Sequence, residues 1–244
     1  MIMFILAGGY GTRLLGAVSD VPKPMAPVNG VPFLKLQLDN WIQQGQKSFV
    51  FLLHHQAELI ITFLKEQIEL FDSKVSISWI VEEKALGTGG SIANAISKLD
   101  LSGYVLIANA DTWLDSGPNI ISGSDGPKIG LVEVEDASRY GLVEVDRSGI
   151  VTGFIEKTHK SISGSLSTIN AGIYKLPTNI FKYKKDQVFS LEAEVLPELV
   201  DNRLLYADYL SSNFFDIGVP EDYYKFCDWH KNLMEKMIIC RHSY

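Results

Sequence analysis

The stretch MIMFILAGGYGTRL, residues 1–14, decides the fold. It begins with a short, unbroken apolar run, which is typical of a strand buried on both faces of a sheet. Gly8, Gly9 and Gly11 follow at once, and glycines let a backbone turn sharply and bring N–H groups against an anion. Arg13 adds a permanently charged fork that suits phosphate oxygens. This order predicts a phosphate-binding loop after a buried strand, and we expect the loop to lead towards a helix whose N-terminus also favours phosphate.

The loop differs from two widespread phosphate-binding motifs. It lacks the Gly-Lys-Ser/Thr ending of a P-loop. Gly9, Gly11 and Gly16 also miss the G-x-G-x-x-G spacing of a dinucleotide site, which argues against an oxidoreductase. Further along, Pro22 and Pro24 stiffen the backbone around Lys23, which favours a rigidly held charge at the mouth of the loop.

The first 111 residues alternate between strand and helix patterns. A buried strand is predicted at 48–53 and further strands at 75–82 and 104–111. Helices are predicted at 33–44 and 56–70, and residues 87–99 are expected to lead through a loop into another helix. Such alternation is the signature of a parallel sheet with helices on both faces.

The second half changes to short segments with period-two alternation, which predict an antiparallel insertion or extension of the sheet. We expect residues 169–176 to return to the main sheet. A helix over 190–200 should be interrupted or end near Pro197. The remaining predicted elements are alternating strands at 129–135, 141–146 and 150–156, late strands at 204–210 and 213–218, and a final helix over 221–237.

Composition and charge exclude several classes of protein. The formal net charge is −7, which argues against general affinity for nucleic acid or an anionic membrane. Two cysteines, Cys227 and Cys240, are too few for a disulfide scaffold and lack a metal-site pattern. We read no signal peptide, and no apolar run approaches the roughly 18 residues of a membrane span. These features predict a cytoplasmic protein, which we expect to form a single domain over residues 1–244 because no linker interrupts the pattern.

Seven motifs together resemble the sugar nucleotidyltransferase family, in that family's order and across nearly the whole chain. Within the family, PKPMAP followed by PFL and LGTGG is most similar to the D-glycero-α-D-manno-heptose 1-phosphate guanylyltransferases. Mannose-1-phosphate guanylyltransferases and uridylyl- or cytidylyltransferases share much of this framework. The motifs are LAGGYGTRL (6–14), PKPMAPVNGVPFL (22–34), LGTGGSI (86–92), NADT (109–112), FIEK (154–157), INAGIY (169–174) and FFDIGVPED (214–222).

The resemblance implies a Rossmann-like three-layer α/β sandwich with a parallel-dominated mixed sheet and a small antiparallel sugar-binding lobe. Residues 1–111 would mainly bind nucleotide, and residues 112–244 would mainly bind sugar phosphate. It also implies Mg²⁺, held by Asp111 and Asp216, with Arg13 and Lys23 completing the catalytic set. The nucleotide would be held by Leu6, Ala7, Gly8, Gly9, Gly11, Thr12, Arg13, Lys23, Glu82, Gly87 and Thr88. The sugar phosphate would be held by Asn109, Gly141, Glu156, Lys157, Asn170 and Ala171.

Two positions depart from the family pattern. Ala110 replaces the usual glycine before the first metal aspartate, and its methyl group crowds a tight strand end. Thr158 replaces the usual proline after Glu-Lys, which changes the expected course of the sugar-binding loop.

These residue types suit attack of a sugar-phosphate oxygen on the α-phosphorus of a nucleotide. The second pKa of a phosphate is about 6, so the nucleophile is already an anion and needs no general base. The obstacle is repulsion between two polyanions, which Arg13, Lys23, Lys157 and Mg²⁺ would offset. Glu82, placed just before LGTGG, could accept both adjacent donors of guanine, which favours GTP.

Other functions remain open at this stage. The same fold and mechanism could serve another base or another phosphorylated acceptor. A non-catalytic subunit that senses nucleotide sugars is a different class, but it would not need the whole charge-handling set. The expected partners are therefore a nucleoside triphosphate and a sugar 1-phosphate, with no nucleic acid or membrane, and with a homo-oligomer as an open possibility.

Overall fold

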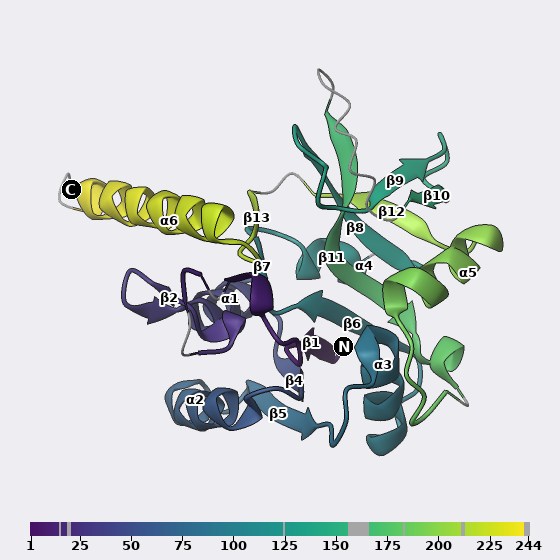
Figure 1. The fold of residues 1–244 in the computed structure, drawn as a ribbon, viewed down its shortest axis with the longest axis horizontal. Helices are drawn as coiled ribbons and strands as arrows, with labels where there is room; N and C mark the ends of the chain where they lie inside the picture. Colours follow the sequence, from purple (N-terminus) through teal and green to yellow (C-terminus); the bar gives the residue numbers. More distant parts are fainter. Residues whose placement is uncertain are drawn as a thin grey trace.

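A mixed sheet forms the central layer, with its strands in the order β10-β9-β11-β6-β1-β4-β5, with β8 paired to β11 and β12 paired to β8 (Figure 1). The computed structural model describes residues 1–14, 16–18, 21–123, 125–155, 166–182, 184–210 and 213–241, the side chains of Thr12 and of 237–241 excepted. Its four neighbouring strands β6, β1, β4 and β5 are all parallel, as the alternating pattern predicted. These strands are β1 (Met3–Leu6), β4 (Ser48–Leu53), β5 (Ser76–Val81) and β6 (Tyr104–Asn109).

Helices cover both faces of this sheet because successive side chains of each strand point to opposite sides. Met3 and Ile5 of β1 are buried in one cluster with residues of α1 (Phe33–Gln43) and α2 (Ala57–Leu70). Phe4, between them, is buried in a second cluster with α3 (Gly87–Lys98) and α5 (Leu196–Asp201). The predicted three-layer α/β architecture is confirmed.

The antiparallel extension is also present. β11 (Ser167–Pro177) pairs antiparallel with β6 and continues along β8 (Lys128–Val134). β9 (Leu142–Val145) and β10 (Val151–Ile155) form a hairpin, and β12 (Tyr206–Tyr209) lies along β8. In Figure 1 these strands occupy the part of the molecule opposite α2 and β5.

Several short elements have no counterpart among the predictions. β7 (Thr112–Leu114) pairs antiparallel with β13 (Phe214–Asp216) in a sheet of its own, so the late strand does not join the main sheet. β2 (Pro27–Val28) and β3 (Val31–Pro32) form a minimal hairpin. α4 (Pro118–Gly123) and a 3₁₀ turn, η3 (Thr178–Phe181), complete the set.

The prediction that the glycine loop leads towards a helix N-terminus is wrong. The loop continues into one 3₁₀ turn, η1 (Thr12–Leu14), and a second such turn, η2 (Lys23–Met25), follows. Among the described residues the first α-helix begins only at Phe33. The prolines on either side of Lys23 disfavour a continuous α-helix there, and only the short 3₁₀ turn η2 forms.

The prediction for 190–200 needs a smaller correction. A π-helical turn, η4 (Leu191–Val195), precedes α5, and Pro197 lies in the first turn of α5, not at a helix end. Proline is tolerated at such a start because the first N–H groups of a helix have no partner within it. The final helix, α6 (Pro220–Arg241), projects from the body (Figure 1). Every helix among the described residues is too short or too polar to span a bilayer.

Candidate active site

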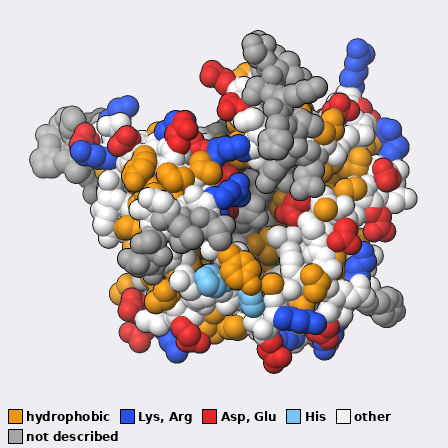
Figure 2. Space-filling model, in the orientation of Figure 1, with side chains coloured by type: hydrophobic (Ala, Val, Ile, Leu, Met, Phe, Trp, Pro, Cys, Tyr) orange, Lys and Arg blue, Asp and Glu red, His pale blue; other side chains and the backbone are white. Residues whose placement is uncertain are grey.

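Three adjoining cavities open where the parallel strands end, and Asp111 lines all of them. Ligands of open α/β sheets bind outside the carboxyl ends of the strands. The cavities measure about 380, 280 and 80 Å³. In Figure 2 this face of the molecule is hollowed near its middle, with cationic and histidine side chains around the hollow.

The 380 Å³ cavity, called the nucleotide cavity below, joins the glycine loop to the start of α3. It is walled by Leu6, Gly8, Gly9, Glu82, Gly87 and Thr88, all predicted on the nucleotide side. Tyr10 and His54, which were not predicted, also line it. The Tyr10 ring lies 6.0 Å from the ring of His54 and 5.0 Å from that of His55, measured between centroids.

The 80 Å³ cavity lies beside the nucleotide cavity and is lined by Ala7, Gly11 and Lys23 among others. Gly11 has a positive φ of 66°, and a Cβ atom there would lie 3.1 Å from Cγ of Lys23. A glycine therefore lets the lysine cross the loop closely.

Lys23 meets the two aspartates where the cavities join. Its Nζ donates to Oδ2 of Asp111 at 3.0 Å, and the lysine side chain is only 13% exposed. Asp216 lies on β13 opposite Thr112, and its Oδ1 accepts from the N–H of Gly218 at 2.7 Å. Burial raises the pKa of Asp216, and the nearby charge of Asp111 raises it further. Pairing of β7 with β13 thus brings together carboxylates that are 105 positions apart in sequence.

This donor set suits Mg²⁺, which prefers oxygen ligands and often takes one or two carboxylates, with phosphates and waters completing the shell. The described residues hold no cluster of three or more acidic, histidine or cysteine side chains that could enclose a metal ion. Asp111 and Asp216 lie close together, and the single positive charge of Lys23 balances only one of the two carboxylates, so negative charge remains for a cation to neutralise. Asp111 and Asp216 therefore fit an ion that is shared with bound phosphates.

The 280 Å³ cavity, called the sugar cavity below, lies on the other side of Asp111. It is lined by Arg13, Asn109, Asp111, Gly141, Asn170 and Asp216, all of which were predicted for the site. Arg13 was predicted to hold the nucleotide, but it lines this cavity and not the nucleotide cavity. The pairing of β11 with β8 shifts in register between Asn170 and Tyr174, and Gly172 within this break has a φ of 70°. A Cβ atom at Gly172 would lie 2.6 Å from Nδ2 of Asn109, so the glycine makes room for this side chain. Asn170 is held by its own bond to the Tyr174 hydroxyl, at 2.7 Å.

Not every predicted residue is placed in these walls. Ala171, a residue of β11, is 1% exposed, points into the hydrophobic core and lines none of the three cavities. Glu156 and Lys157 lie outside the described residues, as does the side chain of Thr12.

Sequence reasoning missed five polar residues of the sugar cavity: Thr112, Arg139, Tyr140, Tyr174 and Glu192. Arg139 is ion-paired with Asp222 in the first turn of α6, and it donates to the hydroxyl of Tyr140 at 3.0 Å. This carboxylate and the neighbouring tyrosine help to raise the pKa of Arg139 despite the opposing effect of burial. The signal available in the sequence was a cation two positions before the predicted Gly141.

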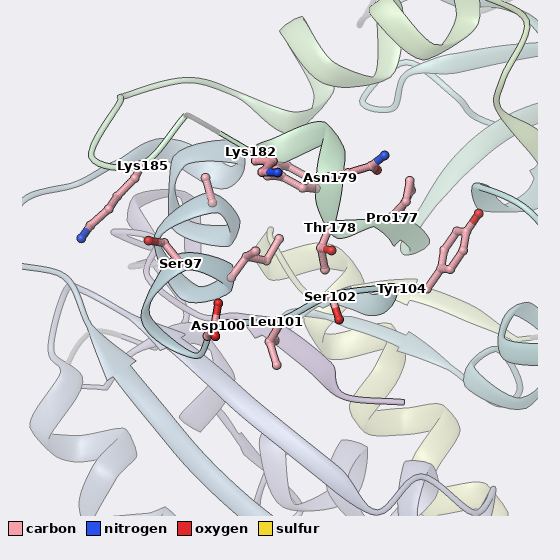
Figure 3. A pocket seen from close by; sticks show the side chains of 14 residues that line it. Ser97, Asp100, Leu101, Ser102, Tyr104, Pro177, Thr178, Asn179, Lys182 and Lys185 are labelled. Atoms are coloured by element: carbon pink, nitrogen blue, oxygen red, sulfur yellow. The ribbon is translucent and has the colours of Figure 1, made fainter.

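A larger cavity, of about 590 Å³, lies at the opposite end of α3. In Figure 3, Lys182 and Asn179 lie on one wall and Ser97 and Asp100 on the other. The nucleotide cavity takes Gly87, Thr88 and Ser91 from the first half of α3, whereas this cavity takes Ala93, Ile96 and Ser97 from its second half. None of its lining residues belongs to the predicted site.

Comparison with known proteins gives a consistent result. Residues 2–231 match the family model described as nucleotidyl transferase. A D-glycero-alpha-D-manno-heptose 1-phosphate guanylyltransferase from Campylobacter jejuni is 35% identical over 93% of this chain and 98% of its own length. The catalytic subunit beta of mannose-1-phosphate guanylyltransferase from Drosophila melanogaster is 31% identical over 90% of this chain and 60% of its own length.

Among solved structures, that of HddC from Yersinia pseudotuberculosis complexed with GMP-PN is similar, with a TM-score of 0.77 and 33% identity. The match covers 94% of this chain and 99% of HddC. Family model, relatives and fold agree with the charge cluster at the junction of the cavities. The chain therefore belongs to the nucleotidyl transferase family and is a sugar-1-phosphate nucleotidyltransferase.

Proposed function

We propose that this enzyme transfers a guanylyl group from GTP to a heptose 1-phosphate, giving a GDP-sugar and pyrophosphate. The observation that carries this proposal is the cluster of Lys23, Asp111 and Asp216. Asp111 lines both the nucleotide cavity and the sugar cavity, Asp216 lines the sugar cavity, and Lys23 lines the 80 Å³ cavity beside them. A reaction between two phosphorylated substrates needs a charge-handling centre at such a junction.

The glycine loop and Lys23 would hold the triphosphate on one side of the junction. On the other side, Arg13 would draw the anionic sugar phosphate towards the α-phosphorus. The Pro-Lys-Pro backbone and the contact with Gly11 limit the positions that Lys23 can take, so its charge is placed before the substrates arrive. The bond that forms joins a sugar-phosphate oxygen to the α-phosphorus, and the bond that breaks releases pyrophosphate.

Mg²⁺ is part of the proposal, with Asp111 and Asp216 as its protein ligands. When bound it would neutralise charge on the phosphates. The protein's own contribution is to hold both carboxylates at the junction through the β7–β13 pairing.

The base and the sugar are proposed from the relatives and from Glu82. Both the Campylobacter and the Drosophila relatives are named as guanylyltransferases. Glu82 lines the nucleotide cavity, and its Oε2 accepts from the N–H of Leu86 at 3.1 Å, which fixes the carboxylate. Its Oε1 has no hydrogen-bond partner within the described part of the chain, so it is available to a guanine donor.

Guanylyl transfer to mannose 1-phosphate is the second candidate. The Drosophila relative, whose name gives mannose 1-phosphate as its substrate, supports it at 31% identity. In either case the product is an activated sugar, which a glycosyltransferase would use to build surface polysaccharide or another glycan. We further propose that the enzyme works in the cytoplasm.

A screen of pyrophosphate release tests the proposal. GTP, ATP, UTP and CTP are each combined with heptose 1-phosphate or mannose 1-phosphate, in the presence and absence of Mg²⁺. We expect the highest kcat/KM for GTP with heptose 1-phosphate, and dependence on Mg²⁺. Preference for UTP or CTP would overturn the choice of base, and preference for mannose 1-phosphate would favour the second candidate.

Asp111→Asn tests the metal role within the same assay. We expect most turnover to be lost while the fold remains intact, because an amide is a weaker ligand for Mg²⁺ and carries no charge. Circular dichroism checks the fold. Near-normal turnover would remove Asp111 from the metal site.

A further inference from the structure

Glu192 is placed between the two substrate cavities but has no part in the proposed chemistry. It is half-buried at the start of η4 and lines both the nucleotide cavity and the sugar cavity. Among the described residues, Asn109 and Asp111 are the only others that line both of these cavities. A carboxylate in this position faces substrates that carry negative phosphates, so it needs a function that outweighs the repulsion.

One oxygen of this carboxylate is fully engaged by the protein. Oε2 accepts from the hydroxyl of Thr88 at 2.7 Å and from the hydroxyl of Ser190 at 3.0 Å. The Thr88 hydroxyl in turn accepts from the N–H of Leu191 at 2.8 Å. Oε1 has no hydrogen-bond partner among the described residues, so one acceptor of a fixed carboxylate is left for a ligand.

The backbone beneath Glu192 is held equally firmly. The carbonyl of Phe189 accepts from the N–H groups of Gly89 and Gly90 at 3.1 and 3.2 Å. The Ser190 hydroxyl accepts from the N–H of Ala193 and so caps η4. π-Helical turns are rare and occur frequently at functional sites. The carboxylate is therefore oriented before substrate binds, as recognition of a specific polar group requires.

The surroundings indicate which group it recognises. In the sugar cavity Glu192 shares the wall with Asn170 and Tyr174, and its negative charge contributes to the raised pKa of the buried Tyr174. Arg13 and Arg139 supply the positive charge of that cavity, whereas Glu192 adds an acceptor. An ionised carboxylate accepts hydrogen bonds and repels phosphate, so its partner should be a neutral hydroxyl.

We propose that Glu192 is a specificity-determining residue that accepts a hydrogen bond from one hydroxyl of the sugar ring through Oε1. This inference rests on the proposed function, since it assigns a contact within the same reaction. A site built to bind a substrate hydroxyl rejects the analogue that lacks it, because the buried acceptor is then left without a partner.

The experiment combines protein and substrate changes. Wild type, Glu192→Gln and Glu194→Gln are assayed for kcat/KM with GTP and a series of monodeoxy analogues of the sugar 1-phosphate. In Glu192→Gln the amide oxygen can keep the Thr88 and Ser190 bonds, which leaves an N–H₂ group where Oε1 was. Glu194 is the matched control, because it is exposed, lies on the same turn, bonds the N–H of Ser190 and lines none of the cavities described above.

We expect wild type and Glu194→Gln to lose roughly tenfold or more in kcat/KM when one particular ring hydroxyl is removed. With the unmodified sugar 1-phosphate, the kcat/KM of Glu192→Gln should be at least roughly tenfold below that of wild type, mainly through a higher KM for the sugar 1-phosphate. With the analogue that lacks this hydroxyl, the kcat/KM of Glu192→Gln should fall little further. The same loss from that analogue in all three proteins would overturn the inference.

Two further outcomes also decide it. If wild type loses kcat/KM when 2′-deoxy-GTP replaces GTP but Glu192→Gln does not, Glu192 contacts the ribose of the nucleotide and the proposal is wrong. If that variant does not fold, Glu192→Asp replaces it, and wild-type tolerance of every monodeoxy analogue would by itself refute the contact. Failure of wild type to turn over any unmodified GTP and sugar 1-phosphate pair would instead defeat the proposed function.

Discussion

The charged form of Asp216 is electrostatically unfavourable, and its position at the site explains why. The carboxylate is buried beside Asp111, and both effects favour its protonated form. Lys23 and the N–H of Gly218 stabilise its charge but do not cancel that cost. Functional sites commonly hold such groups, whose full stabilisation comes only with a bound ligand.

The first prediction concerns the pH dependence of stability for Asp216→Asn. Because the pKa of Asp216 is raised in the folded protein, the native state binds more protons than the unfolded state just above the ordinary carboxyl pKa. The free energy of unfolding contributed by this group therefore falls as pH rises through the raised pKa. We expect Asp216→Asn to be more stable than wild type at neutral pH, and this difference to vanish in acid.

Urea denaturation without added metal, at pH 7.5 and near pH 3.5, measures this difference. The control is Asp39→Asn, whose carboxylate pairs with Lys35 four positions earlier on α1, with both side chains partly exposed. This substitution should not make the protein more stable at neutral pH. A variant of Asp216 that is destabilised at pH 7.5 would contradict the prediction.

The second prediction concerns Lys23→Gln. The loss of a preplaced positive charge at the reacting centre should lower kcat by about 100-fold or more. Lys35→Gln is the matched control, because it also removes an ion-paired lysine but one that lines none of the cavities described above. Pyrophosphate release at saturating substrate makes the measurement, and equal kcat values for the two variants would exclude Lys23 from the centre.

At the scale of elements, the start of α3 and the segment before η4 are packed against each other. Of the glycines in the GTGG motif, Gly87 was predicted for the nucleotide, and it does line the nucleotide cavity. The motif's glycines also serve packing, because a Cβ atom at Gly89 would lie 2.3 Å from the ring of Phe189, and one at Gly90 would lie 2.3 Å from the carbonyl oxygen of Gln187. The motif thus positions both the nucleotide cavity and Glu192.

The third prediction follows from this contact. Gly89→Ala should destabilise the protein by about 1–3 kcal/mol, because the added methyl group overpacks a buried contact. It should also raise the KM values, since Phe189 and Glu192 move together. Gly123→Ala is the control, because a Cβ atom there meets nothing within 4 Å. Thermal unfolding and steady-state kinetics measure the two effects, and the prediction fails if both glycine variants behave alike.

At this scale the long elements were predictable and the short ones were not. Strands β1, β4 and β6 have mostly apolar runs, β5 begins with serines that alternate with apolar residues, and the helices have clear apolar stripes, so local sequence identifies these elements. β7 has three residues and is defined only by its pairing with β13. The π-helical turn η4 has the same local composition as a helix and is distinguished only by where its carbonyls bond.

At the scale of the whole molecule, both halves contribute to the same cores. The cluster that contains Met3 and Leu34 also contains Val132 and Ile169 from the second half. The ladder between β6 and β11 crosses the proposed boundary as continuous sheet. The halves that would bind nucleotide and sugar phosphate therefore share their hydrophobic interior.

The fourth prediction is a single cooperative unfolding transition for the chain. Shared cores should prevent one half from unfolding while the other remains folded. In one variant Trp41 is kept as the only tryptophan and reports the first half by fluorescence; in a second variant Trp113 is kept and reports the second half. We expect their urea midpoints to coincide with each other and with circular dichroism, and separated midpoints would show two folding units.

The sequence by itself determined the α/β architecture, the glycine loop after β1 and most of the charged residues that line the cavities. Those signals depend on residue type and on neighbours a few positions away, which local patterns record. The tertiary structure decided which charges meet: Lys23 with Asp111, Asp111 with Asp216, and Arg139 with Asp222. It also decided that Glu192 stands between the cavities, because contacts across 80 or more positions depend on how strands pair and helices pack, which no local pattern specifies.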